Sequence, residues 1–126
     1  MTPSGLHILV VENHADTLRS LQLYLQQAGH IVGTSRTLEE GLRQLRSQNY
    51  QVVISDIGLP DGRGWDLFRD MDPIEVPFAI AISGFGLNAD RGRSLAAGFR
   101  HHLLKPFRPE ELDLLLSEAN MKETAG

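Results

Sequence analysis

The chain has 126 residues, with 12 Lys and Arg against 16 Asp and Glu, a formal net charge of −4 and no cysteine. This length suits one domain with a single core. The acidic balance argues against direct nucleic-acid binding, and the lack of cysteine excludes disulfides, zinc–thiolate sites and cysteine nucleophiles. The sequence shows neither a signal-peptide layout nor an apolar run of membrane-spanning length. We therefore expect a cytoplasmic protein that does not insert into a membrane.

Strand and helix patterns alternate five times along the chain. Short apolar runs predict strands buried on both faces of a parallel sheet, and apolar residues at helical spacing predict amphipathic helices between them. The expected strands cover residues 6–11, 30–34, 52–56, 77–82 and 99–104, the last of them less apolar and therefore at a sheet edge. The expected helices begin near residues 15, 37, 65, 88 and 109, and the third is short, spanning 65–71. This alternation predicts a doubly wound α/β sandwich with helices on both faces of the sheet.

Four of the expected strands end in polar or charged residues: Glu12 and Asn13, Asp56, Ser83 and Lys105. Because the carboxyl ends of parallel strands meet at one edge of a sheet, these side chains can converge. Any one of them alone could be a helix cap, a turn residue or a solvated side chain, and it is their coincidence that favours a site. Two carboxylates and an amide oxygen suit Mg²⁺, and a carboxylate beside such an ion can accept a phosphoryl group. A lysine and a hydroxyl can bind the phosphoryl oxygens.

The motifs around these residues resemble the receiver domain of two-component response regulators, from about Leu6 to Met121. They are Val10-Val-Glu-Asn13, Ser55-Asp-Ile-Gly-Leu-Pro-Asp-Gly62, Ile82-Ser-Gly-Phe85 and Leu104-Lys-Pro-Phe107. The resemblance implies a flavodoxin-like, three-layer (βα)5 fold with strand order 2-1-3-4-5. It also implies one receiver domain over residues 1–126, with tails at 1–5 and 122–126.

The resemblance further implies a phosphorylation switch in which Asp56 accepts a phosphoryl group from a histidine kinase or a phosphotransfer protein. Ser83 would hydrogen-bond this group, Lys105 would pair with it, and the Lys105–Pro106 peptide bond would be cis. The change would pass through the face formed by the fourth helix, fifth strand and fifth helix, where a homodimer could also form. Such a domain assists its own phosphorylation and dephosphorylation, and we expect no enzyme activity on a metabolite.

A Mg²⁺ or Mn²⁺ site is implied as well, made by Glu12, Asn13, Asp56 and the backbone carbonyl of Gly58. The family usually has two acids after the first strand, whereas the second position here is Asn13. A neutral amide in place of an anionic ligand removes charge from a hard-cation site. We therefore predict weaker Mg²⁺ affinity than in a receiver with two acids.

His102 stands three residues before Lys105, where the family commonly has a Tyr or Phe that acts as a switch. One interpretation is a half-exposed histidine on an edge strand. The other is a switch residue that turns inward when Ser83 is drawn to the phosphoryl group, with pH-sensitive switching because a charged imidazole resists burial near Lys105. The sequence around His102 resembles receivers attached to hybrid sensor kinases more than those of transcription factors.

Three other functions compete with this one. A phosphatase with an aspartyl nucleophile would need Asp-x-Asp where this chain has Glu12-Asn13-His14. A flavin-binding electron carrier would need a Ser/Thr/Gly-rich phosphate loop there, and acidic residues oppose an anion. The third alternative is a degenerate receiver that binds partners without phosphorylation, because both Asn13 and His102 depart from the usual pattern.

Overall fold

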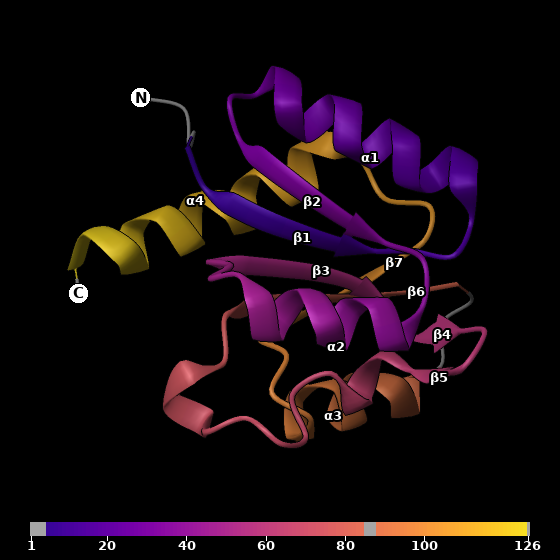
Figure 1. The fold of residues 1–126 in the computed structure, drawn as a ribbon. Helices are drawn as coiled ribbons and strands as arrows, with labels where there is room; N and C mark the ends of the chain where they lie inside the picture. The colour runs from indigo at the N-terminus through magenta and orange to yellow at the C-terminus, as the bar shows by residue number, and fades with distance from the viewer. Residues whose placement is uncertain (1–4, 85–87, 126) are drawn as a thin grey trace.

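The centre of the molecule is a five-stranded parallel sheet, seen in a computed structural model that describes the backbone of residues 5–84 and 88–125 and the side chains of 5–84 and 91–120. The strands lie in the order β2-β1-β3-β6-β7 (Figure 1). They are β1 (His7–Val11), β2 (Ile31–Ser35), β3 (Val52–Asp56), β6 (Phe78–Ser83) and β7 (His101–Leu104). Numbered in chain order within this sheet, they have the predicted 2-1-3-4-5 arrangement, with the less apolar strand β7 at an edge.

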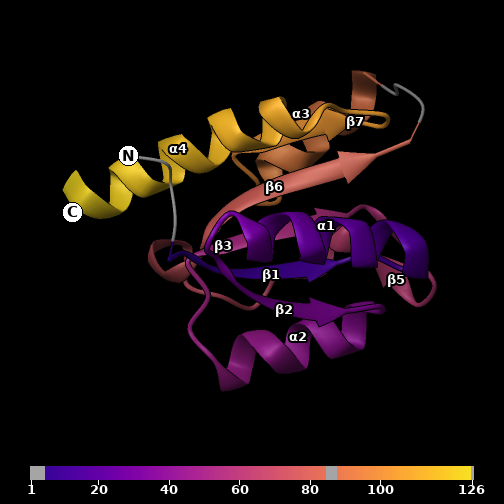
Figure 2. The same ribbon diagram turned by 90° about the horizontal axis from the view of Figure 1, so that it is seen from above.

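Helices cover both faces of the sheet, as Figures 1 and 2 show. One face carries α1 (Ala15–Gln27) and α4 (Pro109–Ala125), and the other carries α2 (Leu38–Ser47) and α3 (Asn88–Ala96). Successive strand residues point to opposite faces, so Ile8 and Val10 belong to one buried cluster and Leu9 and Val11 to the other. The three-layer fold is therefore the predicted one. Helix α4 continues through most of the segment 122–126 that was predicted as a tail.

The expected third helix over residues 65–71 is wrong. The chain forms a small antiparallel pair, β4 (Gly58–Leu59) with β5 (Gly62–Arg63), and then a single 3₁₀ turn, η1 (Gly64–Asp66). Bonds from residue i+3 to residue i follow, for example from the Leu67 amide to the Gly64 carbonyl at 3.1 Å. The segment ends at a second 3₁₀ turn, η2 (Pro73–Glu75). A stretch this short gains little from helix formation, and its shape is set by the burial of Leu67 and Phe68 against the sheet.

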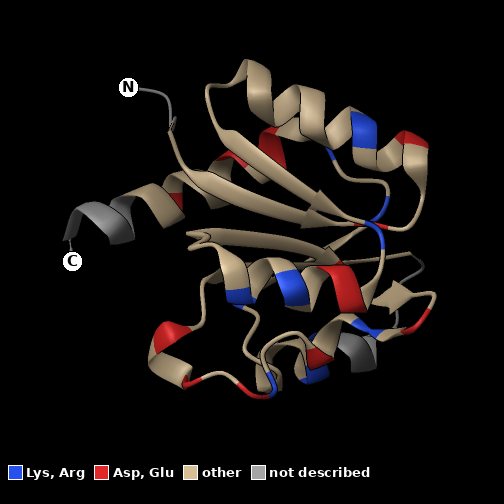
Figure 3. Cartoon of the chain, viewed as in Figure 1, with Lys and Arg blue, Asp and Glu red and all other residues tan. Residues whose placement is uncertain are grey.

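Charged side chains lie mainly on the helices and loops (Figure 3). Within the five described strands of the sheet, Asp56 is the only Lys, Arg, Asp or Glu. This carboxylate ends the central strand and is 9% exposed, so it needs partners from neighbouring elements. Separately, none of the helices that the structure describes is long and apolar enough to cross a membrane.

Candidate functional site

Three of the predicted strand-end side chains meet at the carboxyl edge of the sheet. Strands β1 and β3 are neighbours in parallel register, which sets Glu12, just after β1, beside Asp56 at the end of β3. The Lys105 ammonium, which follows β7, bonds both carboxylates, with Nζ 2.6 Å from Glu12 Oε1 and 2.9 Å from Asp56 Oδ2. Residues 93 and 49 positions away from Lys105 in sequence thus share one cation.

Burial and this shared cation act in opposite directions on the two acids. Burial raises the pKa of the Glu12 carboxyl, but hydrogen bonds from Lys105 and from the His14 amide outweigh it and hold the pKa below its ordinary value. Burial also raises the pKa of the Asp56 carboxyl; the nearby negative charge of Glu12 adds to this, and the Lys105 bond does not fully offset it. Burial lowers the pKa of Lys105, yet its two carboxylate partners raise it overall. Asp56 is consequently the more basic carboxylate of the pair.

The loop after Asp56 holds this carboxylate from the other side. The Gly58 amide donates to Asp56 Oδ1 at 3.2 Å, and the Gly64 amide donates to the Ile57 carbonyl at 2.8 Å. A Cβ on Gly64 would lie 2.5 Å from the Asp56 carbonyl oxygen, so glycine is required where the loop returns to the strand. Asp61 fastens the same loop to α2 by accepting the Leu38 and Glu39 amides at 2.8 and 3.0 Å.

Ser83 and His102 form a buried pair behind the charged residues. Ser83 ends β6 and is 6% exposed, and its Oγ lies 2.7 Å from His102 Nε2. His102 is only 8% exposed, so the interpretation of a half-exposed histidine is wrong. Its ring lies inward because the small Ala81 and Ser94 leave room beside β7, and Ser94 Oγ lies 2.9 Å from His102 Nδ1. The Lys105–Pro106 peptide bond is cis.

The response regulator receiver domain family matches residues 8–117 of this chain, a stretch that contains every residue of the site. The chain belongs to the response regulator receiver family. Receivers are phosphoacceptor signalling domains of two-component systems and are not classical enzymes, which leaves the degenerate receiver as the remaining alternative.

Several relatives agree with the family assignment. An uncharacterized 14.6 kDa protein from the sodA1 3′ region of Leptolyngbya boryana is 31% identical, covering 93% of this chain and 92% of that protein. The two-component response regulator PhoP of Pseudomonas aeruginosa is 32% identical, and the match covers 94% of this chain but 53% of PhoP. The receiver thus spans about half the length of that relative. A CheY-like receiver domain protein from Methanospirillum hungatei JF-1 has a TM-score of 0.86 and 25% identity, covering 98% of this chain and 100% of that one.

This receiver departs from the usual acid pair at Asn13. The Asn13 backbone carbonyl accepts two bonds from the Arg36 guanidinium, at 3.3 and 3.0 Å. These bonds fix the loop between β1 and α1, with the half-buried Asn13 side chain following Glu12 directly. An amide oxygen therefore stands next to the carboxylate pair, where most receivers have a second acid.

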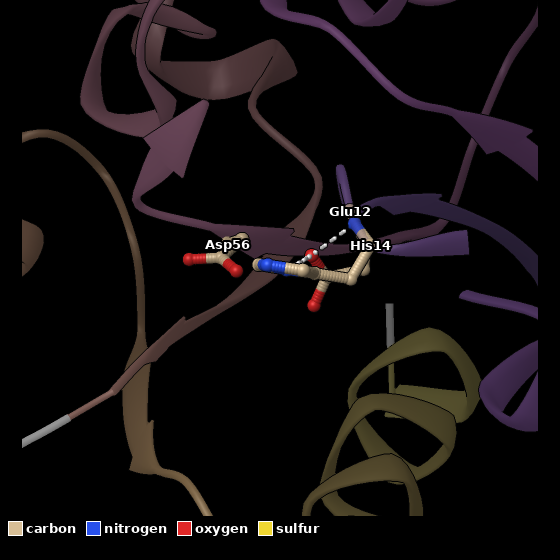
Figure 4. Close-up of side chains that lie close together, drawn as sticks. All are labelled: Glu12, His14 and Asp56. Atoms are coloured by element: carbon tan, nitrogen blue, oxygen red, sulfur yellow. Dashed lines mark hydrogen bonds and ion pairs between the residues drawn. The ribbon is translucent and has the colours of Figure 1, made fainter. Parts of the chain in front are cut away.

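His14 is a site residue that the sequence did not predict. Its amide and its ring Nδ1 lie 3.1 and 3.3 Å from Glu12 Oε2, and the exposed ring approaches Asp56 (Figure 4). Ligand atoms of Glu12, His14 and Asp56 lie within 4.8 Å of one another, so this group could hold a metal ion. Its position directly after Glu12-Asn13, at the N-cap of α1, was the available signal.

The donor set fits a hard divalent cation. Carboxylate and amide oxygens are the ligands that Mg²⁺ and Mn²⁺ prefer, and Glu12, Asp56 and Asn13 supply them at one edge of the sheet. Gly58 presents its amide to Asp56, which places its backbone beside the same carboxylate. In the structure Lys105 neutralises the two carboxylates.

Proposed function

We propose that this receiver is a phosphorylation switch in a two-component phosphorelay, with Asp56 as the phosphoacceptor. The observation that carries the proposal is the Lys105 ammonium, bonded at once to Glu12 and Asp56 at the carboxyl edge of the sheet. A buried cation in this position can neutralise charge on an incoming phosphoryl group as well as on the acid that receives it. Asp56 is the better acceptor of the two acids because it is the more basic and the less buried.

The transfer forms one bond and breaks another. An Asp56 carboxylate oxygen attacks the phosphorus of a phosphohistidine on the donor protein, and a P–O bond forms as the P–N bond breaks. The electron pair of the P–N bond stays on the donor imidazole, which takes up a proton from solvent. Lys105 then pairs with the new phosphoryl oxygens, and the Ser83 hydroxyl can donate to them. The added charge of about −2 at this site shifts the population between two states of the domain.

A divalent cation, Mg²⁺ or Mn²⁺, belongs to this proposal. Glu12, Asn13, Asp56 and the Gly58 carbonyl would hold it, and the neighbouring His14 ring could add a nitrogen ligand. When bound, the ion supplies positive charge that offsets the charge of the phosphoryl oxygens. Glu12 contributes a carboxylate whose lowered pKa keeps it ionised.

The donor would be a histidine kinase or a phosphotransfer protein that reaches the edge of the sheet. A mostly apolar groove of about 690 Å³ opens beside Lys105, lined by Thr17 and Tyr24 of α1 and by Phe107 and Leu112. This groove could seat a partner next to the acceptor. The output face would be formed by α3, β7 and α4, and a second copy of the chain could use the same face.

Intact mass spectrometry tests the proposal. After incubation with acetyl phosphate and Mg²⁺, the wild-type protein should gain the mass of one phosphoryl group, and Asp56→Asn should gain none. Asp70→Asn, which alters an exposed acid after η1, should behave like the wild type. Unchanged mass of the wild-type protein, or equal labelling of Asp56→Asn, would contradict the proposal, and the first result would favour the degenerate receiver.

A further inference from the structure

A series of hydrogen bonds runs from the acceptor site to the far side of α3. Ser83 Oγ lies 2.7 Å from His102 Nε2, and His102 Nδ1 lies 2.9 Å from Ser94 Oγ. The Trp65 indole N–H donates to the same Ser94 Oγ at 2.9 Å. The four residues come from β6, β7, α3 and η1, so four separate segments meet in this polar series. We call it the Ser83–Trp65 relay.

The relay is buried where it matters. Ser94 is 0% exposed, and Ser83 and His102 are nearly as inaccessible. Buried polar groups that lose a partner cannot turn to water instead, so each bond constrains the next. A movement of the Ser83 hydroxyl must therefore be accommodated by the imidazole ring, and a movement of the ring by Ser94.

The donors and acceptors of the relay can be matched in two ways. The indole N–H of Trp65 only donates, so Ser94 Oγ accepts from it and keeps its own proton to give. If Ser94 donates to Nδ1 of a neutral His102 ring, then Nε2 carries the ring proton and donates to Ser83. The Ser83 proton is then available for a phosphoryl oxygen. If instead Nδ1 carries the ring proton, Ser83 donates to Nε2, and its proton is not available outward.

The other end of the relay reaches the surface of the receiver. Trp65 is half-buried, and the Arg93 guanidinium carbon lies 4.3 Å from the centroid of an indole ring. Arg93 is exposed on α3 and directly precedes Ser94 in the sequence. A cation stacked on an indole depends on the position of the ring, so a shift of Trp65 changes a charged part of the α3 surface.

We propose that Ser94 and Trp65 are positioning residues for the phosphorylation site. They orient the His102 ring so that Ser83 can donate its proton outward, and they carry the change in Ser83 on phosphorylation to Trp65 and Arg93. The proposal rests on the proposed function at Asp56. It differs from a simple inward turn of His102 because the ring is already inward and bonded on both sides.

Trp65 is the only tryptophan of the protein, so its indole N–H gives one assignable NMR resonance. With acetyl phosphate and Mg²⁺, this resonance should shift in the wild-type protein. In Ser94→Ala the shift should be lost when samples are compared at equal phosphorylated fraction, measured by intact mass. Ser117→Ala, which removes a hydroxyl bonded to the Asp113 carbonyl within α4, should keep the wild-type shift.

A second variant reads the relay from the opposite end. Trp65→Phe keeps an aromatic ring in the same place but removes the indole N–H. The imidazole resonances of His102 should then move in the unphosphorylated protein, although Trp65 and His102 are joined only through Ser94 in the relay. This arm holds even if Ser94→Ala fails to fold.

The outcomes separate this proposal from the function proposed above. If the wild-type protein gains a phosphoryl group while the Trp65 resonance stays in place, or shifts equally in Ser94→Ala, the relay is refuted and the acceptor role of Asp56 stands. If the protein takes up no phosphoryl group, Ser83→Ala decides. An altered Trp65 resonance in that variant supports the relay, and an unaltered one overturns it.

Discussion

Asp56 and Glu12 share one ammonium, and the balance between them is set by how many hydrogen bonds each accepts. Glu12 accepts from Lys105 and His14, whereas Asp56 accepts from Lys105 and Gly58 at longer distances. The ionised form of Asp56 is therefore less favourable in the folded protein than in the unfolded one, which is the meaning of its raised pKa. A reactive carboxylate is kept at a cost in stability.

Asp56→Asn should stabilise the fold. The amide keeps an oxygen for the Gly58 N–H, removes the repulsion with Glu12 and leaves Lys105 paired with Glu12. Because the raised pKa destabilises the ionised acid, the gain should develop as the pH rises above the ordinary value of 3.8 and should be small below it. At neutral pH we expect roughly 0.5–2 kcal/mol in urea unfolding. A loss of stability at pH 7 would show that the Lys105 bond outweighs burial.

Asn13→Asp should strengthen Mg²⁺ binding. The substitution adds a negative charge next to Glu12, and a charge this close to a divalent ion is worth more than about 1.4 kcal/mol, or about tenfold in affinity. Isothermal titration calorimetry with Mg²⁺ measures the change. Asn49→Asp adds the same charge at an exposed position before β3 and should leave the affinity unaltered. Equal dissociation constants for Asn13→Asp and the wild type would remove Asn13 from the metal site.

At the scale of elements, the strands were predictable and the third helix was not. Each strand is a short apolar run such as Val52–Ile54, and burial on both faces leaves few other structures for it. The segment after Asp56 mixes helix-like spacing with three glycines, and its 3₁₀ turn depends on where Leu67 and Phe68 pack. That packing is a tertiary property, which local spacing does not reveal.

Gly64→Ala should destabilise the receiver by about 1–3 kcal/mol, the usual cost of overpacking. The new methyl group would lie 2.5 Å from the Asp56 carbonyl oxygen and 2.9 Å from Ser55 Oγ. Gly92→Ala is the matched control, because a Cβ there meets nothing within 4 Å and alanine favours the α3 helix. It should stabilise by about 0.5–1 kcal/mol. Thermal or urea unfolding of both variants gives the comparison, and similar stabilities would contradict the tight approach at Gly64.

At the scale of the whole molecule, the parallel topology explains why much of the site could be predicted. Once the strands are parallel, Glu12, Asp56 and Lys105 must end at one edge, so their types and positions in the chain were sufficient signals. His14 could not be predicted because its ring direction depends on the start of α1. The bonds of His102 to Ser94 and of Trp65 to Ser94 join segments 8 and 29 residues apart, and nothing in the local pattern marks them.

The stability of the whole domain should fall as the pH drops below neutral, partly through His30. Burial lowers the pKa of His30, and the nearby charge of Asp113 opposes this only in part. The unfolded chain therefore binds a proton that the folded protein resists, so stability is full above the ordinary value of 6.5 and declines as the pH falls through it.

His30→Asn isolates this contribution, because the asparagine oxygen can replace Nδ1 as the acceptor of the Leu6 amide. Urea unfolding at pH 7.5 and pH 5.5 should show a larger loss of stability for the wild type than for the variant. Equal losses would mean that His30 is not a source of the acid sensitivity.

The most direct measurement on the central claim is chemical mapping of the acceptor. Borohydride reduces an acyl phosphate on aspartate to homoserine, which peptide mass spectrometry locates to a single residue. After treatment with acetyl phosphate and Mg²⁺, the account predicts homoserine at position 56, and a much lower yield in Lys105→Met, which removes the shared ammonium. Homoserine at another acid, or none in the wild-type protein, would contradict it.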